Sequence, residues 1–201
     1  MHDLTPAELR VLGSLLEKQR TTPDAYPLTL NGLRAACNQT TSRDPVVAYD
    51  DATIREALHQ LGRRRWTRLA SGAGSRAAKY RHLFDEALQL DEGELAVLCV
   101  LMLRGPQTVS ELLTRTERLH RFPGAAGVEA VLERLVGREL VAHIGRRPGQ
   151  REERFAQRLG EEGAEPLPAE PRGEDRLARI ERELAELRAE VVELRQRTTG
   201  G

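Results

Sequence analysis

Apolar residues recur at intervals of three and four in two stretches of the chain, one near its start and one near its middle. Residues 5–18 align without a gap on residues 91–104. The aligned pairs that match are Glu8 with Glu94, Leu9 with Leu95, Val11 with Val97, Leu12 with Leu98, and Leu15 with Leu101. This internal repeat, of period about 80 residues, predicts two copies of one helical unit.

The first copy predicts three helices. Thr5, with Glu8 three residues later, has the spacing of a capping box and starts the first helix. Thr29 is the expected N-cap of the second helix, and Asp50 or Asp51 that of the third. The third helix has an apolar side at helical spacing, formed by Ile54, Ala57, Leu58 and Leu61.

Short extended runs follow the third helix in each copy. In the first copy, 66–70 and 78–82 predict a hairpin around the glycine-containing turn 71–75. The second copy predicts helices over 91–103, from Thr108, and near 127–137, then strands over 141–144 and 151–155. This order is that of a winged helix-turn-helix. We therefore expect a mostly α fold with short β-wings, built from tandem winged-helix domains over 1–86 and 87–159.

The last forty residues have a different character. Residues 160–174 are rich in Gly, Pro, Glu and Ala, which predicts a flexible linker. Over 175–197 the apolar positions alternate steps of three and four, which predicts a coiled-coil helix and a parallel homodimer. A single amphipathic helix folded back on a domain is the alternative. The predicted dimer seam is Leu177, Ile180, Leu184, Leu187, Val191 and Leu194.

Charge is distributed unevenly along a chain whose formal net charge is zero. Residues 1–82 hold 13 basic and 8 acidic residues, 83–160 hold 11 and 12, and 161–201 hold 7 and 11. Seven basic residues and no acidic one lie between Arg63 and Arg81. Such a segment suits the phosphates of nucleic acid. Arginine accounts for 29 of the 31 cations, however, and this bias by itself says little about function.

The sequence lacks the motifs of the common enzyme classes. There is no P-loop, dinucleotide fingerprint or nucleophile elbow. Cys37 and Cys99 lie in apolar helical runs and predict buried, reduced thiols, and the five histidines lack the spacing of a metal site. We therefore expect a non-enzymatic protein with no catalytic residues, no cofactor and no metal. The absence of a long apolar stretch or a signal peptide predicts a cytoplasmic protein without a membrane partner.

Several motifs together resemble those of a known family. They are VLGSLLEKQRTTPDAYPLTLNGLRAACNQ at 11–39, RDPV at 43–46, GSR with KY at 74–80, LRGPQT at 103–108, RTERLH at 115–120 and RRPGQREERF at 146–155. Over about residues 4–160 the chain resembles the YceH-like bacterial proteins, described as tandem winged helices of unassigned biochemical function. The resemblance implies the same architecture and supplies no catalytic residue.

Two functions fit this sequence. The first is a dimeric DNA-binding protein, a transcriptional regulator, whose first domain meets the double strand with its third helix and its Arg-rich wing. The expected phosphate contacts are Arg63, Arg64, Arg68, Arg76 and Lys79. The candidate base contacts are Thr53, Arg55, His59 and Gln60.

The alternative is a protein-interaction adaptor or scaffold, with another protein as its partner. Zero net charge favours it, as does the unusually long connection 39–50 between the second and third helices, which could obstruct entry into a groove. The third helix of the second copy also favours it, because Glu129, Glu133 and Glu139 would face the phosphates of a duplex and repel them.

Overall fold

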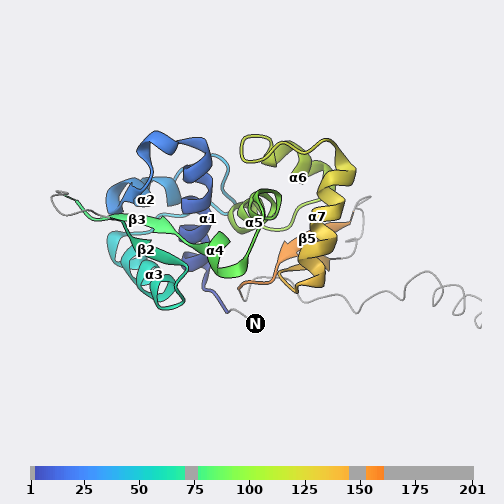
Figure 1. Ribbon diagram of the computed structural model, residues 1–201. Coiled ribbons are helices and arrows are strands. Elements are labelled where there is room, and N and C mark those ends of the chain that lie inside the picture. The colour runs from blue at the N-terminus through green and yellow to red at the C-terminus, as the bar shows by residue number, and fades with distance from the viewer. Residues whose placement is uncertain (1–2, 71–76, 145–152, 161–201) are drawn as a thin grey trace, which may run out of the picture. The chain divides into compact units, whose positions relative to one another are not determined.

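The computed structural model describes residues 3–70, 77–144 and 153–160, which belong to one compact unit. These residues form a mostly helical fold with two small antiparallel sheets (Figure 1). The predicted fold class is confirmed at this level. Of the predicted linker 160–174, Gly160 is described and forms a β-bridge with Leu4. The rest of the linker and the predicted coiled-coil helix, with all six seam residues, lie outside the described residues.

The first repeat begins with α1 (Pro6–Thr21), the 3-10 turn η1 (Pro23–Ala25) and the two-residue strand β1 (Leu28–Thr29). It continues with α2 (Leu30–Cys37), α3 (Asp51–Arg63), β2 (Thr67–Leu69) and β3 (Lys79–His82). The short helix α4 (Phe84–Leu88) then leads into the second repeat and spans the domain boundary predicted at residue 86.

The second repeat contains α5 (Glu92–Arg104), α6 (Val109–Thr116), α7 (Ala125–Gly137), β4 (Val141–Ile144) and β5 (Arg154–Gln157). The prediction of a strand over 151–155 is wrong at both ends within the described residues. Glu153 is not in a strand, and β5 continues to Gln157. The reason is that Ala156 and Gln157 are buried and pair with β4, a long-range contact that the local sequence does not encode.

The predicted starts of α1, α2, α3, α5 and α6 are confirmed by their caps, whereas α7 begins at Ala125, two residues before the predicted position, and has no side-chain cap. Thr5 caps α1 in a complete capping box: its hydroxyl accepts from Glu8 N at 3.2 Å, while the Glu8 carboxylate accepts from Thr5 N at 2.7 Å. Asp91 and Thr108 form the same arrangement at α5 and α6, and Asp50 caps α3. Each cap satisfies backbone N–H groups that the helix itself cannot bond, and this is why the boundaries are visible in the sequence.

The first sheet has a strand that the sequence does not predict. Its order is β1-β3-β2, with Leu28 opposite Tyr80 and Thr67 opposite His82, both pairs antiparallel. The hairpin of β2 and β3 is predicted, but β1 falls in a segment expected to be a polar loop. Two residues are too short for a period of two to be recognised, so only pairing with β3 defines this strand.

The two repeats share one hydrophobic core. Helix α1 packs against α5, and α5 also packs against α6 and α7 (Figure 1). Every residue from Gly93 to Leu103 is buried, because α5 has neighbours on several sides. Helices α1 and α5 approach each other closely at Gly13, whose carbonyl accepts a hydrogen bond from Cys99 Sγ at 3.4 Å. A Cβ atom at Gly13 would lie 2.9 Å from Leu103 Cδ2.

Candidate nucleic-acid interface

Helix α3 presents a polar outer face. Ile54, Ala57, Leu58 and Leu61 are buried as predicted, which turns the remaining positions outward. The candidate base contacts fall into two groups. Arg55 and His59 are exposed, whereas Thr53 and Gln60 are partly buried and engaged within the helix. The Thr53 hydroxyl donates to Asp50 Oδ1 at 2.7 Å, and Gln60 Nε2 donates to Glu56 Oε1 at 2.6 Å.

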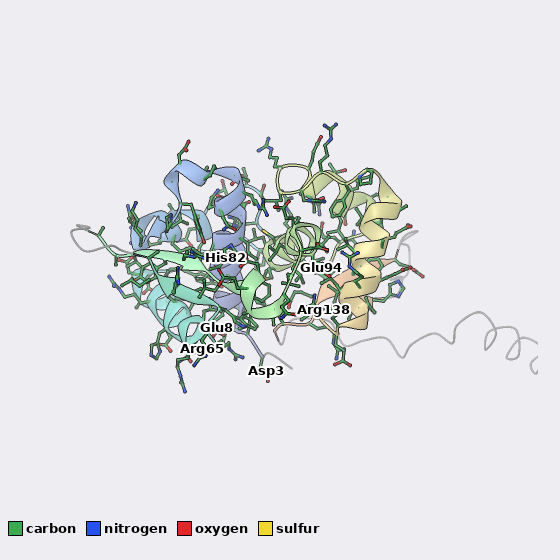
Figure 2. The ribbon with its side chains drawn as sticks, in the orientation of Figure 1. Asp3, Glu8, Arg65, His82, Glu94 and Arg138 are labelled. Carbon is green, nitrogen blue, oxygen red and sulfur yellow. The ribbon has the colours of Figure 1, made fainter. Side chains whose placement is uncertain are left out.

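Helix α3 ends in a turn that exposes three consecutive arginines. The backbone N–H of Arg65 donates to Gly62 O at 2.9 Å and that of Trp66 to Leu61 O at 2.9 Å, which is the Schellman pattern. Arg65 takes the left-handed conformation that this pattern requires, with φ of 62°. Because Trp66 is buried beneath the turn, the side chains of Arg63, Arg64 and Arg65 are left exposed on the surface, where Figure 2 labels Arg65.

Of the five described arginines between positions 63 and 81, four have no carboxylate partner among the described residues. Arg63, Arg64, Arg65 and Arg68 are exposed, and no described Asp or Glu forms an ion pair with any of them. The Arg64 guanidinium lies 5.9 Å from the centre of the Trp66 ring, a cation–π distance. Arg81 is the exception, since it donates to Glu86 Oε1 at 2.9 Å.

The two strands add further positive charge. Arg68 on β2 lies directly opposite Arg81 on β3, and like charges at opposed positions destabilise a strand pair. Lys79 is exposed on β3. Arg76, the remaining predicted phosphate contact, lies outside the described residues. We name the exposed set Arg63, Arg64, Arg65 and Arg68 the basic strip.

At the corresponding surface of the second repeat, the arginines form ion pairs with carboxylates of the same repeat. Arg134 of α7 donates to Asp91 Oδ2 at 2.6 Å. Arg138 donates to Glu94 Oε2 at 3.2 Å, and both of these residues are labelled in Figure 2. Helix α7 ends in the same turn as α3, but the left-handed position is Glu139, with φ of 57°. The repeats therefore share a backbone, while Arg65 in the first is replaced by a carboxylate in the second.

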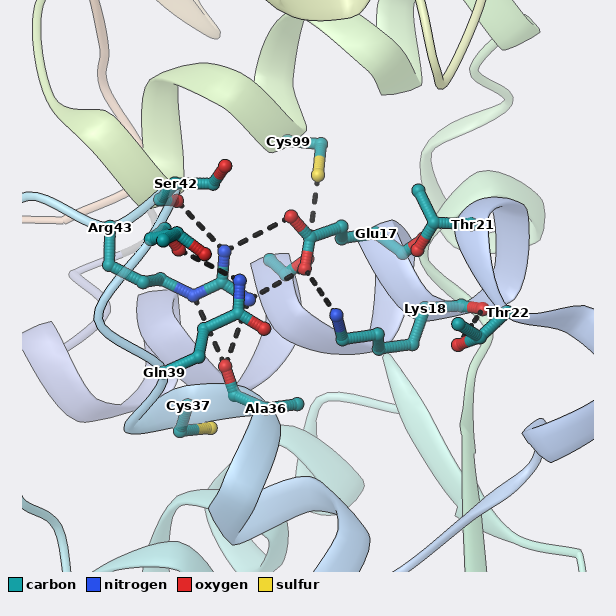
Figure 3. A network of polar contacts seen from close by, with 12 residues as sticks. Glu17, Lys18, Thr21, Thr22, Ala36, Cys37, Gln39, Ser42, Arg43 and Cys99 are labelled. Carbon is teal, nitrogen blue, oxygen red and sulfur yellow. Dashed lines mark hydrogen bonds and ion pairs between the residues drawn. The ribbon is translucent and has the colours of Figure 1, made fainter.

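The long connection 39–50 is anchored by an arginine whose role the sequence does not reveal. Arg43 donates through Nη1 to Glu17 Oε1 at 3.1 Å and through Nη2 to Glu17 Oε2 at 2.6 Å (Figure 3). Its guanidinium also donates to the carbonyls of Ala36 and Ser42. Burial alone would raise the pKa of Glu17, but the hydrogen bonds and charge of Arg43 outweigh burial and lower it.

The connection is tied to the second repeat as well. The backbone N–H of Asp44 donates to Leu103 O at 2.9 Å, and Arg104 donates to Ser42 Oγ at 2.7 Å. At its far end, the Asn38 side chain bonds both the N–H and the carbonyl of Tyr49, next to the N-cap of α3. The connection is thus held against α1 and α5, and it fixes the start of α3.

His82 is the most perturbed histidine among the described residues. It is 1% exposed, its Nε2 lies 2.6 Å from Gln19 Oε1, and its Nδ1 lies 3.4 Å from Asp85 Oδ1 without forming a hydrogen bond. Burial lowers the pKa of His82 to about 4, although the Asp85 carboxylate opposes this. The imidazole is therefore neutral at neutral pH and belongs to the core beneath β3.

The two cysteines are free and buried, as predicted. Burial raises the pKa of Cys37 to about 11 and raises that of Cys99 further, so neither is activated as a thiolate nucleophile. In the described ranges no group of three or more His, Cys, Asp or Glu side chains is arranged to hold a metal ion. None of the helices within those ranges has both the length and the apolar character needed to cross a bilayer.

Fold and surface define a class: a mostly helical protein made of two related halves, each of which ends in a small antiparallel sheet. Residues 4–150 match the family model described as "Protein of unknown function, DUF480", and the chain belongs to this family.

Close relatives support this assignment. The chain is 46% identical over 206 residues to a UPF0502 protein of Pelobacter propionicus, covering 96% of this chain and 94% of the relative. It is 47% identical over 205 residues to the UPF0502 protein azo0627 of Azoarcus sp., covering 96% and 90%. A UPF0502 protein of Solibacter usitatus is 46% identical over 200 residues, covering 96% and 97%.

Proposed function

We propose that this chain is a dimeric DNA-binding protein that acts as a transcriptional regulator, and that its first repeat is a winged helix that contacts the duplex. The order α1, β1, α2, α3, β2, β3, with β1 at the edge of the sheet, supports a winged helix. In this arrangement α3 is the recognition helix, and the hairpin of β2 and β3 is the wing.

The observation that carries the proposal is that the arginines near the ends of α3 and α7 differ in whether they are paired with carboxylates. The basic strip is exposed and lacks carboxylate partners among the described residues, whereas Arg134 and Arg138 are paired with Asp91 and Glu94. Cations that are not neutralised internally can displace the counterions condensed on the phosphates of DNA, and this displacement supplies nearly all of the affinity in non-specific binding. We therefore assign phosphate contact to the first repeat.

Within this proposal the residues have separate roles. Arg63, Arg64 and Arg68 contact phosphates, with Arg76 and Lys79 extending that contact along the wing. Arg55 and His59 are the leading base contacts, because they are exposed on α3. An arginine reads guanine through two hydrogen bonds in the major groove. Thr53 and Gln60 would first have to exchange their bonds to Asp50 and Glu56.

The proposed dimer rests on the heptad seam from Leu177 to Leu194. A pair of chains would present two copies of α3, as DNA-binding dimers do for two half-sites. Replacing Leu184 and Leu187 with Glu in the full chain should convert the dimer to a monomer, as measured by light scattering. A dimer that persists in this variant would exclude the seam as the dimer interface.

The test of DNA binding is a salt titration. The full chain is titrated into a labelled duplex of about 30 base pairs and mixed sequence between about 50 and about 200 mM salt, and anisotropy gives the affinity at each concentration. The test variant is Arg64→Ala with Arg68→Ala. The control is Arg118→Ala with Arg121→Ala, which removes the same charge from exposed positions of the second repeat.

Each phosphate contact contributes about 0.9 to the slope of log affinity against log salt concentration. The test variant should therefore lose about 2 from that slope, with the control unchanged. Equal loss in both variants would place the contact elsewhere. No binding by the unmodified chain at the lowest salt would refute DNA binding.

A protein-interaction adaptor is the second candidate, and the surface of α7 favours it. Glu129, Glu133 and Val136 follow each other at helical spacing and are all exposed, Val136 at 39%. An acidic face with an apolar residue suits a protein partner better than a duplex. Failure to bind DNA at low salt would make this the leading function.

A further inference from the structure

An open groove of about 420 Å³ lies where the two repeats meet. Its walls come from the first half of α1, the connection 44–49, the end of α5 and strand β5. Both repeats contribute to it, and its volume lies within the range of small-molecule sites. Its described lining includes none of the residues proposed to contact DNA.

Arg10 lines the groove and is buried, with 4% of its surface exposed. Its Nη1 donates to Cys37 O at 3.2 Å and its Nη2 to Pro45 O at 2.6 Å, whereas Nε has no hydrogen-bond partner among the described residues. No described carboxylate forms an ion pair with it. Burial, followed by the nearby charge of Arg43, lowers the pKa of Arg10. The Asp44 carboxylate opposes this lowering without forming an ion pair with Arg10 in the described part of the chain. An anion in the groove would offset more of the cost of burying this cation.

Arg104 is a second cation in the same wall. It is partly buried at the end of α5, and its Nη2 donates to Ser42 Oγ. Burial and then Arg115 lower its pKa. Arg10 and Arg104 thus hold the two ends of the short segment 42–45. Asp44, a carboxylate in the lining, accepts no hydrogen bond from either arginine within the described part of the chain.

The remaining lining is mainly apolar. Leu9, Leu101 and Met102 come from α1 and α5, and Val47 comes from the connection. A ligand that matches this wall must carry a hydrocarbon or aromatic body beside its charged group. The groove therefore combines an apolar surface with two guanidinium groups, and guanidinium groups bind carboxylate or phosphate in strong, directed pairs.

We propose that this groove binds a small organic anion, with its acidic group at Arg10 and Arg104 and its apolar body against Leu101 and Met102. The ligand class is an amphipathic carboxylate, sulfonate or phosphate of low molecular mass. Nucleic acid does not fit this description, because its charge lies on an extended backbone rather than at one end of an apolar body.

The test uses the fluorescent sulfonate 8-anilinonaphthalene-1-sulfonate with the full chain. Two variants alter the groove in different ways: Arg104→Met removes the charge, and Val47→Phe fills the space. Each has a matched control outside the lining, Arg121→Met and Val46→Phe, and both control positions are exposed. Circular dichroism of each variant verifies that it is folded.

Each groove variant should weaken binding of the sulfonate about tenfold or more, and each control should leave it within about twofold. Octanoate should displace the probe, whereas octanol at the same concentration should not. Equal affinity in the two groove variants and their controls would overturn the proposal. Displacement by octanol as efficient as that by octanoate would show that the guanidinium groups do not recognise an anion, and would overturn it equally.

Discussion

Replacement of Arg43 by Met should be among the most destabilising single changes in the chain. The Arg43 side chain is 0% exposed, and its carboxylate partner Glu17 is 13% exposed. The substitution keeps the long apolar stem but removes both hydrogen bonds to Glu17. It also leaves the carbonyls of Ala36 and Ser42 without this donor.

The expected loss of stability follows from the Glu17 carboxylate, which stays in place when Arg43 is removed. Removal of one member of a buried ion pair leaves an uncompensated charge and costs about 3–5 kcal/mol. Glu17 is slightly exposed, and its carboxylate also lies 3.2 Å from Lys18 Nζ, which would remain. The expected loss therefore lies near the lower end, about 3 kcal/mol. A domain has a total stability of about 5–15 kcal/mol, so the variant should retain its fold with a clearly reduced margin.

Urea unfolding followed by circular dichroism gives the free energy of unfolding for each variant. Glu17→Met with Arg43→Met should lose less than the sum of the single variants, because the double variant buries no isolated charge. Arg118→Met, at an exposed site, serves as the control and should change little. A loss below about 1 kcal/mol in Arg43→Met, or strict additivity in the double variant, would refute the assignment of this pair as the anchor of the connection.

Three further predictions concern other parts of the molecule. His82 titrates near 6.5 when unfolded and at about 4 when folded, so the unfolded chain binds more protons between these values. The contribution of neutral His82 to stability is therefore fully present above pH 6.5, and the free energy of unfolding should fall by about 3 kcal/mol toward pH 4. The variant His82→Gln should flatten that decline in urea unfolding measured as a function of pH. An unchanged decline in this variant would show that His82 does not cause it. Gly13→Ala should destabilise the protein by about 1–3 kcal/mol, because the added Cβ would clash with Leu103. The control Gly62→Ala, whose added Cβ has its nearest contact at 4.0 Å, should not destabilise it. Equal melting temperatures of these two variants would contradict the close packing of α1 on α5. If the DNA-binding proposal holds, bound sulfonate probe should change the affinity for the duplex in the anisotropy assay, because the groove lining includes Tyr49, next to the N-cap of α3. The variant Val47→Phe should abolish that change. Unaltered duplex affinity with the probe bound would exclude coupling between the groove and the DNA-binding surface.

The local sequence determined the starts of α1, α2, α3, α5 and α6 because the signals for these starts are local. An N-cap and the residue three positions later form one hydrogen-bonded unit, as at Thr5 with Glu8, so the start of a helix depends on four consecutive residues. Apolar spacing likewise identified the buried side of α3. The excess of positive charge in the first repeat was visible as well, since counting charges requires no partner.

Only the tertiary structure decided which charges remain available and where a ligand could sit. Arg134 and Arg138 carry the same charge as Arg64, but their partners at Asp91 and Glu94 lie about 40 residues away in the chain. The pairing of Arg43 with Glu17, strand β1 and the groove between the repeats depend on contacts of the same kind. Residue types and spacing set what a segment prefers, whereas the partner of a long-range contact is fixed only when the core brings distant segments together.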